Sequence, residues 1–201
     1  QGIIAETHPL ALGVVGSNGG VPATRAVVQE ADVIIFIGCR AGSVTTERWR
    51  FPEPGAVRVV HIDVEPEVVG ANYPTQACVI GDAKLATAAL VDALGPRPAG
   101  LPLTAEARIR KAREDKLVAF TALAASSEAP IRPERLVATL QSLLSPETVI
   151  VLDPGTPCPY FSAYYTNQIA ERTLISNRAH GALGFALPGV IGAARARPGQ
   201  R

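Results

Sequence analysis

Residues 33–37 read Val-Ile-Ile-Phe-Ile, and this stretch decides the fold. An uninterrupted apolar run rich in β-branched residues is typical of a strand buried on both faces of a parallel sheet. Two further runs follow it: residues 57–62 read Val-Arg-Val-Val-His-Ile and end at Asp63, and residues 78–80 read Cys-Val-Ile. The sequence therefore predicts three parallel strands in the first half of the chain, the first of them buried on both faces.

Helical segments separate these strands. Pro22 begins a predicted helix that ends near Glu30, since proline is well tolerated in the first turn of a helix. A short helix is predicted from Pro66, and a longer one covers residues 83–94. Strands that alternate with helices of this length predict an α/β fold with a parallel, doubly wound sheet of the Rossmann-like type.

A segment rich in proline and glycine divides the chain. Residues 95–102 contain three prolines and two glycines and cannot continue a helix or a strand. We therefore expect a linker at 96–103 between a nucleotide-binding-like α/β domain at 1–95 and a partial α/β region at 104–201. The second region has too few predicted strands to close a sheet alone. These strands cover residues 148–152 and 173–175, with helices at 104–125, 133–144, 157–165 and 185–197.

The composition excludes several classes of protein. The 201 residues are 47% hydrophobic and 18% charged, which supplies a core and argues against disorder. A net charge of +1 and only 5% aromatic residues argue against nucleic acid and anionic membranes as partners. The N-terminus does not resemble a signal peptide, and no run approaches the ~18 apolar residues of a membrane helix, so we expect a cytoplasmic protein. Because methionine is absent even at position 1, we expect a processed chain or a segment of a longer one.

The cysteines and histidines are scattered and form no metal-ligand pattern. We expect buried or half-buried thiols in a reducing compartment at Cys39, Cys78 and Cys158. Of the three histidines, only His180 lies beside a glycine-rich segment and is a candidate for chemistry. The competing interpretation is a polar loop residue, which we favour because the sequence shows no partner for it.

Two candidate ligand sites lie in the first half. The glycine-rich loop at residues 16–20 follows an expected strand at 12–15 and precedes a helix, which suits a phosphate. Its spacing is not GxGxxG, so a tight turn is an equal alternative. Asp63, at the end of a strand, either accepts a hydrogen bond from a ribose hydroxyl or serves as a helix cap or loop carboxylate.

The second half contains another strand-to-helix loop, at residues 153–156. Thr156 precedes Pro157 and either caps the helix or donates its hydroxyl to a phosphate. Further along, glycines at 181 and 184 let the backbone approach a flat ligand, and Leu183 between them supports a ring or belongs to the core.

Seven motifs in collinear order resemble the thiamine-diphosphate-dependent enzymes of the acetolactate synthase and benzoylformate decarboxylase type. The segment GIIAETHPL at 2–10, followed by LGVVG at 12–16, resembles the opening of their central domain. The segment GALGFALP at 181–188, together with IGA at 191–193, resembles the start of their diphosphate-binding domain. The remaining motifs are EADVI at 30–34, GCR at 38–40, VHIDVEP at 60–66 and GDA at 81–83.

The resemblance implies thiamine diphosphate and magnesium as cofactors, a 2-keto acid substrate and a homo-oligomer. It implies that Gly181 offers its carbonyl to the aminopyrimidine and that Leu183 holds the cofactor in its bent conformation. Gly155, Thr156 and Pro157 match the loop that approaches the diphosphate. Residues 17–20, Ser-Asn-Gly-Gly, depart from the flavin enzymes' MHG, which makes FAD doubtful here.

Other departures are larger. The family's metal-binding motif, its pyrimidine-binding domain and the glutamate that activates the cofactor have no counterpart in this sequence. We therefore expect a fragment, with residues 104–201 an incomplete diphosphate-binding domain, inactive on its own but derived from an enzyme that decarboxylates or joins 2-keto acids. The alternative is a non-catalytic nucleotide-binding or scaffold subunit with the same central fold. An NAD-dependent dehydrogenase ranks low because the GxGxxG fingerprint is missing.

Overall fold

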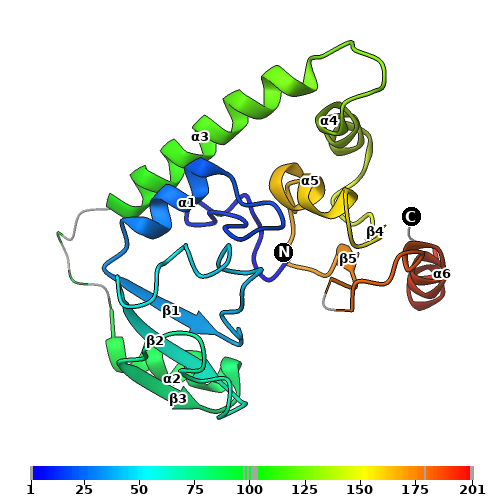
Figure 1. Ribbon diagram of the computed structural model, residues 1–201. Helices are drawn as coiled ribbons and strands as arrows, with labels where there is room; N and C mark the ends of the chain where they lie inside the picture. Colours follow the sequence, from blue (N-terminus) through cyan, green and yellow to red (C-terminus); the bar gives the residue numbers. More distant parts are fainter. Residues whose placement is uncertain (1, 97, 99, 101–103, 179, 200–201) are drawn as a thin grey trace.

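The first half of the chain folds around a three-stranded parallel sheet (Figure 1). The computed structural model describes residues 2–96, 98, 100, 104–178 and 180–199. Its strands β1 (Val33–Ile37), β2 (Arg58–Asp63) and β3 (Ala77–Ile80) lie in the order β1-β2-β3. The predicted α/β class with parallel strands is therefore confirmed, with the strands where the apolar runs predicted them.

One face of this sheet forms a core. Phe36 of β1 pairs with His61 of β2, and their side chains lie on the same face, where Phe36 also contacts Tyr73 with ring centroids 5.3 Å apart. Polar atoms in this core have partners: Tyr73 Oη donates to the carbonyl of Pro52 at 2.9 Å, and His61 Nε2 lies 2.9 Å from the carbonyl oxygen of Cys39. Buried polar groups of this kind need such partners.

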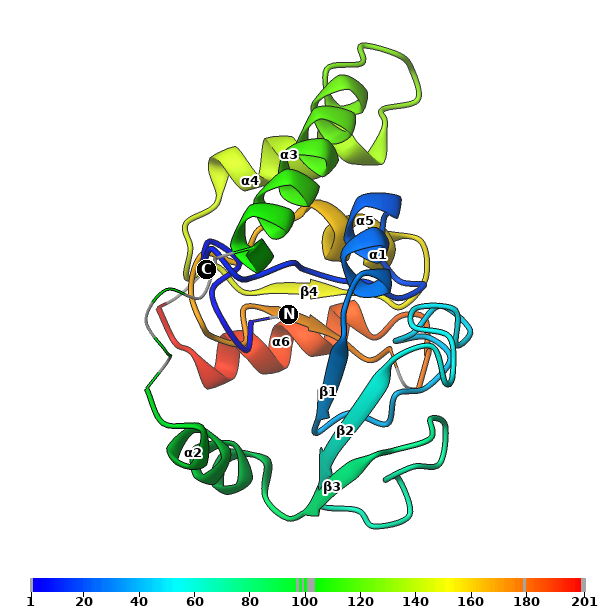
Figure 2. The ribbon, with the colours of Figure 1, turned by 90° about the vertical axis from the view of Figure 1, so that its left-hand side faces the viewer.

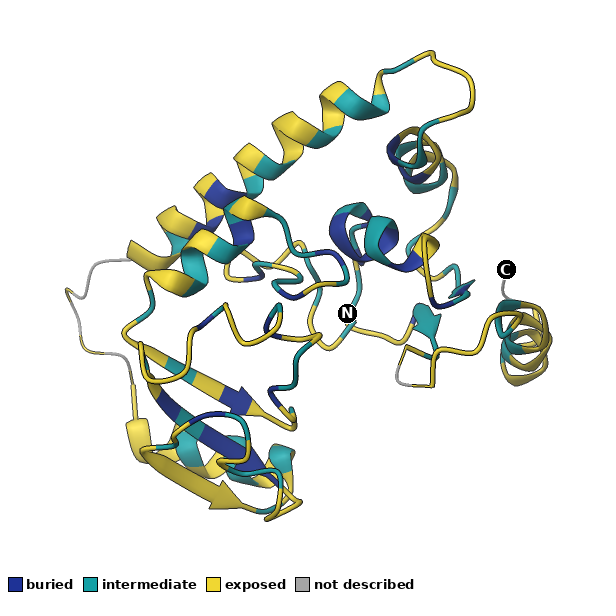
Figure 3. Cartoon of the chain, viewed as in Figure 1, coloured by how far each residue is buried: buried dark blue, intermediate teal, exposed yellow. Residues whose placement is uncertain are grey.

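The opposite face is largely exposed (Figure 3). Helix α2 (Ala83–Leu94) contacts β2, and Ile62 is fully buried. Asp82 caps this helix by accepting from the N–H groups of Lys84 and Leu85, both at 3.0 Å. Alternate residues of β1 and all of β3 remain exposed. The prediction of a strand buried on both faces is therefore wrong for β1, whose alternate residues are exposed.

The second half contains a two-stranded parallel sheet with helices around it (Figure 2). β4 (Ile150–Leu152) pairs with β5 (Leu174–Ser176), and Ile150 lies opposite Leu174. The core beside it contains Val137, Leu152, Cys158, Phe161 and Tyr165. Four helices belong to this half: α3 (Thr104–Ala124), α4 (Pro133–Leu143), α5 (Pro157–Tyr164) and α6 (Ala186–Ala196).

Several contacts join the halves, of which two are the packing of two helices and a pair of bonds near the N-terminus. Helix α1 (Pro22–Gln29) packs against α3. Near the N-terminus, the Glu6 N–H donates to the Asn167 carbonyl at 2.8 Å, and the Glu6 carboxylate accepts from the Asn167 N–H at 3.0 Å. The N-terminal segment therefore lies against the second half. The linker at 96–103 falls mostly outside the described residues, because 97, 99 and 101–103 are not among them, and the division there stays a prediction.

Two predicted elements are absent from the described residues. The helix predicted from Pro66 is a set of turns, in which the Val68 N–H donates to the Glu65 carbonyl at 3.1 Å. Residues 12–15 form no strand, because two of their backbone carbonyls accept hydrogen bonds from side chains. Thr24 Oγ1 donates to Val14 at 3.0 Å, and Arg25 Nε donates to Val15 at 3.1 Å.

The cysteines differ from one another in burial. Cys158 is buried and Cys39 half-buried, as predicted, but Cys78 is exposed because it lies on β3, which pairs only with β2 among the described strands. No helix in the described part of the chain is both long and apolar enough to span a membrane.

Candidate functional site

The candidate site lies in the two loops that follow β4 and β5. Because these strands are parallel, their carboxyl ends meet at one edge of the sheet, where open α/β sheets bind ligands. The first loop covers residues 153–156 and leads into α5. The second covers residues 177–185 and leads into α6, with residue 179 outside the described set.

Gly155 of the first loop lies close to Leu183 of the second loop. A Cβ built on Gly155 would lie 3.6 Å from Leu183 Cδ2, an ordinary van der Waals contact. Gly155 has a φ of +120°, a conformation that L side chains rarely adopt. The Leu183 side chain is 78% exposed, so the contact leaves most of this apolar group available. Of the two interpretations of Leu183, support for a ring or a place in the core, this exposure excludes the core.

Asp153 fixes the second loop to the first. Its Oδ1 accepts from the Ala186 N–H at 2.7 Å, and its Oδ2 accepts from the Gly184 N–H at 3.0 Å. The carboxylate therefore accepts hydrogen bonds from two backbone N–H groups at the start of α6. Its negative charge also interacts favourably with the positive end of the helix dipole. The sequence analysis did not predict this role. Two signals for it were present: an aspartate directly after a strand, and a glycine-rich loop directly before a later helix.

The N-terminus of α5 offers few hydrogen-bond donors. Thr156 occupies the capping position, but its side chain makes no capping hydrogen bond. Pro157 and Pro159 carry no N–H, and the N–H of Cys158 donates to the Gly155 carbonyl at 3.1 Å. Of the two predicted roles for Thr156, helix capping is therefore excluded, and its exposed position leaves the residue open to a ligand.

Gly181 and His180 belong to a tight turn in the second loop. Their N–H groups donate to the Asn177 carbonyl at 2.9 and 3.1 Å, respectively. Gly181 has a φ of +72°, which suits glycine. Both residues are exposed, so His180 takes the position of a polar loop residue, as favoured from the sequence.

The two candidate sites of the first half have structural explanations. Gly16 and Gly19 are buried, and a Cβ on Gly19 would lie 2.7 Å from Ser162 Cβ. The glycines of this loop therefore permit close packing within the protein, which favours the tight-turn alternative. Asp63 is also buried, and its Oδ1 accepts from the Glu65 N–H at 3.0 Å, which is the loop-carboxylate alternative.

Comparison with known proteins supports the resemblance. Residues 1–90 match the family described as "Thiamine pyrophosphate enzyme, central domain". The chain is 30% identical, over 98% of its length, to the "Probable acetolactate synthase large subunit" of Methanocaldococcus jannaschii. It is 28% identical to "Acetolactate synthase" of Mycobacterium avium and 27% identical to "Acetolactate synthase isozyme 3 large subunit" of Escherichia coli, each over 98% of its length.

These matches cover only part of each relative. The alignments cover 33%, 31% and 34% of the three relatives, so the chain spans about a third of their length. The family match covers the first half, whereas the similarity to acetolactate synthases continues through both candidate loops. Residues 1–90 are therefore similar to the central domain of thiamine pyrophosphate enzymes.

Proposed function

We propose that this chain contributes to a thiamine-diphosphate-dependent enzyme that acts on 2-keto acids in an acetolactate synthase-like reaction. The proximity of Gly155 and Leu183 carries this proposal, because it places next to each other the two loops that the resemblance assigns to the cofactor. The names of the relatives support the class of reaction.

The residues of the two loops fit one part of the cofactor. Leu183 presents an exposed apolar side chain next to the bare backbone of Gly155, a combination that supports a flat ring. When bound, thiamine diphosphate supplies the electron sink that decarboxylation of a 2-keto acid requires. The chain's own residues position it: Leu183 supports the ring system, and the Gly181 carbonyl accepts a hydrogen bond from the aminopyrimidine.

The diphosphate end of this site needs a cation. Gly155, Thr156 and Pro157 lie at the start of α5, where two prolines carry no N–H and Cys158 donates within the loop. The Asp153 carboxylate takes up the Gly184 and Ala186 donors at α6. We therefore include magnesium, a hard cation suited to diphosphate oxygens, in the proposed cofactor set. FAD is left out, because the glycines of residues 16–20 are packed against protein.

We also propose that the chain associates with a second copy. Val33, Ile35 and Ile37 are each more than 40% exposed along one face of β1, and Leu187 and Ile191 of α6 are 71% and 56% exposed. Apolar patches of this kind are typical of surfaces that other proteins cover. Sedimentation velocity tests this expectation: a monomer at all concentrations up to the high micromolar range would contradict it.

Titration of the chain with thiamine diphosphate and magnesium, followed by the backbone amide signals of Gly155, Thr156 and Leu183 in NMR spectra, tests the cofactor site. We expect saturable shifts confined to the two loops. Leu183→Ala should abolish them, whereas Leu187→Ala, which removes an exposed leucine just inside α6, should preserve them. Equal loss in both variants, or no shifts at all, would contradict the proposal.

A further inference from the structure

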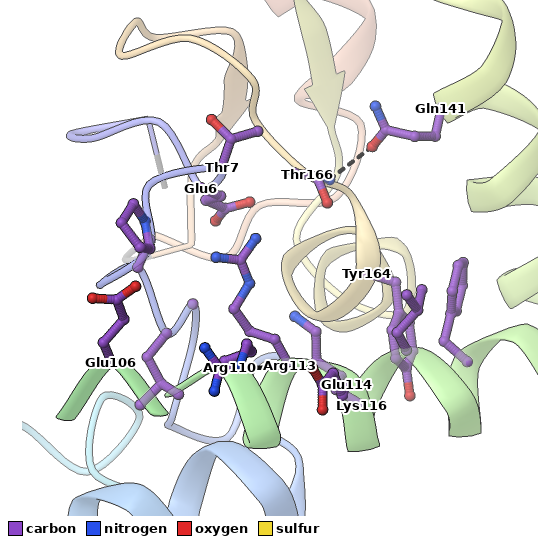
Figure 4. Close-up of a pocket in the computed structure, with 16 residues that line it drawn as sticks. Glu6, Thr7, Glu106, Arg110, Arg113, Glu114, Lys116, Gln141, Tyr164 and Thr166 are labelled. Carbon is purple, nitrogen blue, oxygen red and sulfur yellow. Dashed lines mark hydrogen bonds and ion pairs between the residues drawn. The ribbon is translucent and has the colours of Figure 1, made fainter. Parts of the chain in front are cut away.

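A cavity of about 560 Å³ lies away from the two loops (Figure 4). The N-terminal segment, α3, Gln141 of α4 and the end of α5 form its walls. Its volume falls within the range of small-molecule sites, about 300–1,000 Å³. None of its lining residues belongs to residues 153–156 or 177–185, so it is distinct from the proposed cofactor site.

Three cationic residues of α3 line this cavity, Arg110, Arg113 and Lys116, together with the carboxylates of Glu6, Glu106 and Glu114. Arg113 and Lys116 are three residues apart and therefore lie on the same face of the helix (Figure 4). Arg113 Nη1 donates to the His8 carbonyl at 3.0 Å, and Lys116 Nζ donates to the Ala163 carbonyl at 2.7 Å. These bonds fix both groups but bring no negative charge to them.

Within the described part of the chain, the charges of Arg113 and Lys116 are not balanced by an ion pair. Among the residues that the structure describes, no carboxylate lies within 4.0 Å of either group. Other cations of α3 differ: Arg110 pairs with Glu114 at 4.0 Å, and Lys111 pairs with Asp115. Of the three cations that line the cavity, Arg113 and Lys116 are therefore the two without an ion pair among the described residues.

The surroundings of Lys116 also favour an incoming anion. Burial lowers the pKa of its ammonium group, and the positive charge of Arg113 lowers that pKa further. The Glu6 carboxylate opposes this shift but does not cancel it. Glu6 also accepts the Asn167 N–H, so part of its hydrogen-bonding capacity is already used. An anion beside Lys116 would compensate the charge that burial disfavours.

The rest of the cavity is mainly apolar. Leu117 and Phe120 of α3 follow the cations along the same helix, and Leu12 and Pro9 lie across from them. An inorganic anion would leave these surfaces against water. An occupant with one charged end and an apolar body would use both parts of the cavity.

We propose that this cavity binds a small organic monocarboxylate. Its carboxylate group lies between Arg113 and Lys116, where a guanidinium supplies paired donors and an ammonium supplies a point charge. Its apolar body lies against Leu117 and Phe120.

Hexanoate and its neutral analogue hexanamide are the probes that test this site, since they differ only in the charged group. We expect calorimetric titration of the chain to show saturable binding of hexanoate and binding of hexanamide that is at least ~10-fold weaker. Lys116→Met should weaken hexanoate binding by at least ~10-fold. The matched control is Lys111→Met on the exposed side of α3, which should change it by less than about twofold.

A second variant protects the test from a folding defect. Lys116 also joins α3 to Ala163 of α5, so its replacement removes a contact between these helices. Arg113→Gln keeps Lys116 and its bond to Ala163, and removes one charge together with the bond from Arg113 to the His8 carbonyl. Thermal unfolding of each variant shows whether it is folded. A folded Arg113→Gln protein that binds hexanoate as tightly as the parent chain would overturn the proposal. So would equal affinity for hexanoate and hexanamide, or no saturation by about 10 mM.

Discussion

The Asp153 carboxylate lies 2.7 Å from the backbone nitrogen of Ala186 and accepts its hydrogen bond. Its other oxygen accepts the Gly184 N–H at 3.0 Å, one residue beyond Leu183. One side chain at the end of β4 therefore sets the start of α6 and the position of the leucine that meets Gly155. The two candidate loops are therefore connected through Asp153, which is not among the residues proposed to hold the cofactor.

Asp153→Ala should lower the free energy of unfolding by about 1–2 kcal/mol, as loss of a helix cap does. Hydrogen exchange at the Gly184 and Ala186 amides should become faster, because both lose their acceptor. Asp82→Ala is the matched control, since Asp82 caps α2 with two similar bonds far from these loops. It should lower stability by a similar amount without changing exchange at residues 184 and 186. Unchanged exchange there in Asp153→Ala would contradict the role assigned to Asp153.

Gly155→Ala should destabilise the chain by about 1–3 kcal/mol, the range for a residue held in a sparsely populated conformation. The cost comes from the backbone, with φ at +120°, and not from overlap, since the added Cβ would meet Leu183 at 3.6 Å. Gly192→Ala provides the control: it lies inside α6 with nothing within 4 Å of the new Cβ. That variant should gain about 0.5–1 kcal/mol from helix propensity. Urea denaturation measures both changes, and equal effects of the two substitutions would exclude the backbone explanation.

The sequence predicted the secondary structure best where one local signal dominates. The apolar run at 33–37 became β1 with the predicted bounds, and Pro133 and Pro157 begin the helices predicted from them. The helix predicted from Pro66 failed because the Asp63 side chain bonds the Glu65 N–H and favours a turn. Such a side-chain bond competes with helix formation but leaves no periodic pattern in the sequence.

Long-range contacts could not be predicted in the same way. The resemblance placed Gly155 and Leu183 at one cofactor, and in the structure the two residues lie close to each other. The bond from Asp153 to Ala186 joins residues 33 positions apart, and no spacing rule indicates it. The cavity beside Lys116 depends on how α3 packs against the N-terminal segment, and the charged residues of that helix read only as a solvated face.

The ion pair between Arg25 and Glu47 predicts a loss of stability in acid. Burial alone would raise the pKa of Glu47, but Arg25 at 2.7 Å, together with Ser17 and Arg50, lowers that pKa below its usual value. A carboxylate whose pKa is lowered by folding adds stability above its unfolded pKa, about 4.3, and loses it as the pH falls through the folded value. Glu47→Gln should therefore cost about 1–3 kcal/mol at pH 7 and progressively less below about pH 4.

Glu53→Gln is the control for this prediction, because Glu53 is exposed and none of the described ion pairs includes it. Its effect on unfolding should stay within about 0.5 kcal/mol at both pH values. Urea denaturation at pH 7 and pH 3.5 measures the change in the free energy of unfolding for each of the two variants at each pH. A Glu47→Gln effect that does not shrink in acid would show that the carboxylate charge is not what stabilises this loop.

The last prediction concerns the cofactor: the 201-residue chain should bind thiamine diphosphate more weakly than about 10 μM, equivalent to about −7 kcal/mol. The described residues contain no cluster of three or more metal-ligating side chains, so they offer magnesium no dedicated site. The donors near α5 and α6 are mostly used within the protein, and each ordinary hydrogen bond contributes only about 0.5–1.5 kcal/mol net.

Isothermal calorimetry with thiamine diphosphate, with and without magnesium, measures this affinity. Thiamine without its diphosphate is the matched ligand: if the apolar surface at Leu183 supplies most of the binding, both ligands should bind within about tenfold of each other. A dissociation constant below about 10 μM that requires both the diphosphate and magnesium would mean that these residues already hold the anion and its cation. In that case the start of α5 would bind the diphosphate despite the few donors that Pro157 and Pro159 leave there, and donor scarcity would not limit the affinity of this site.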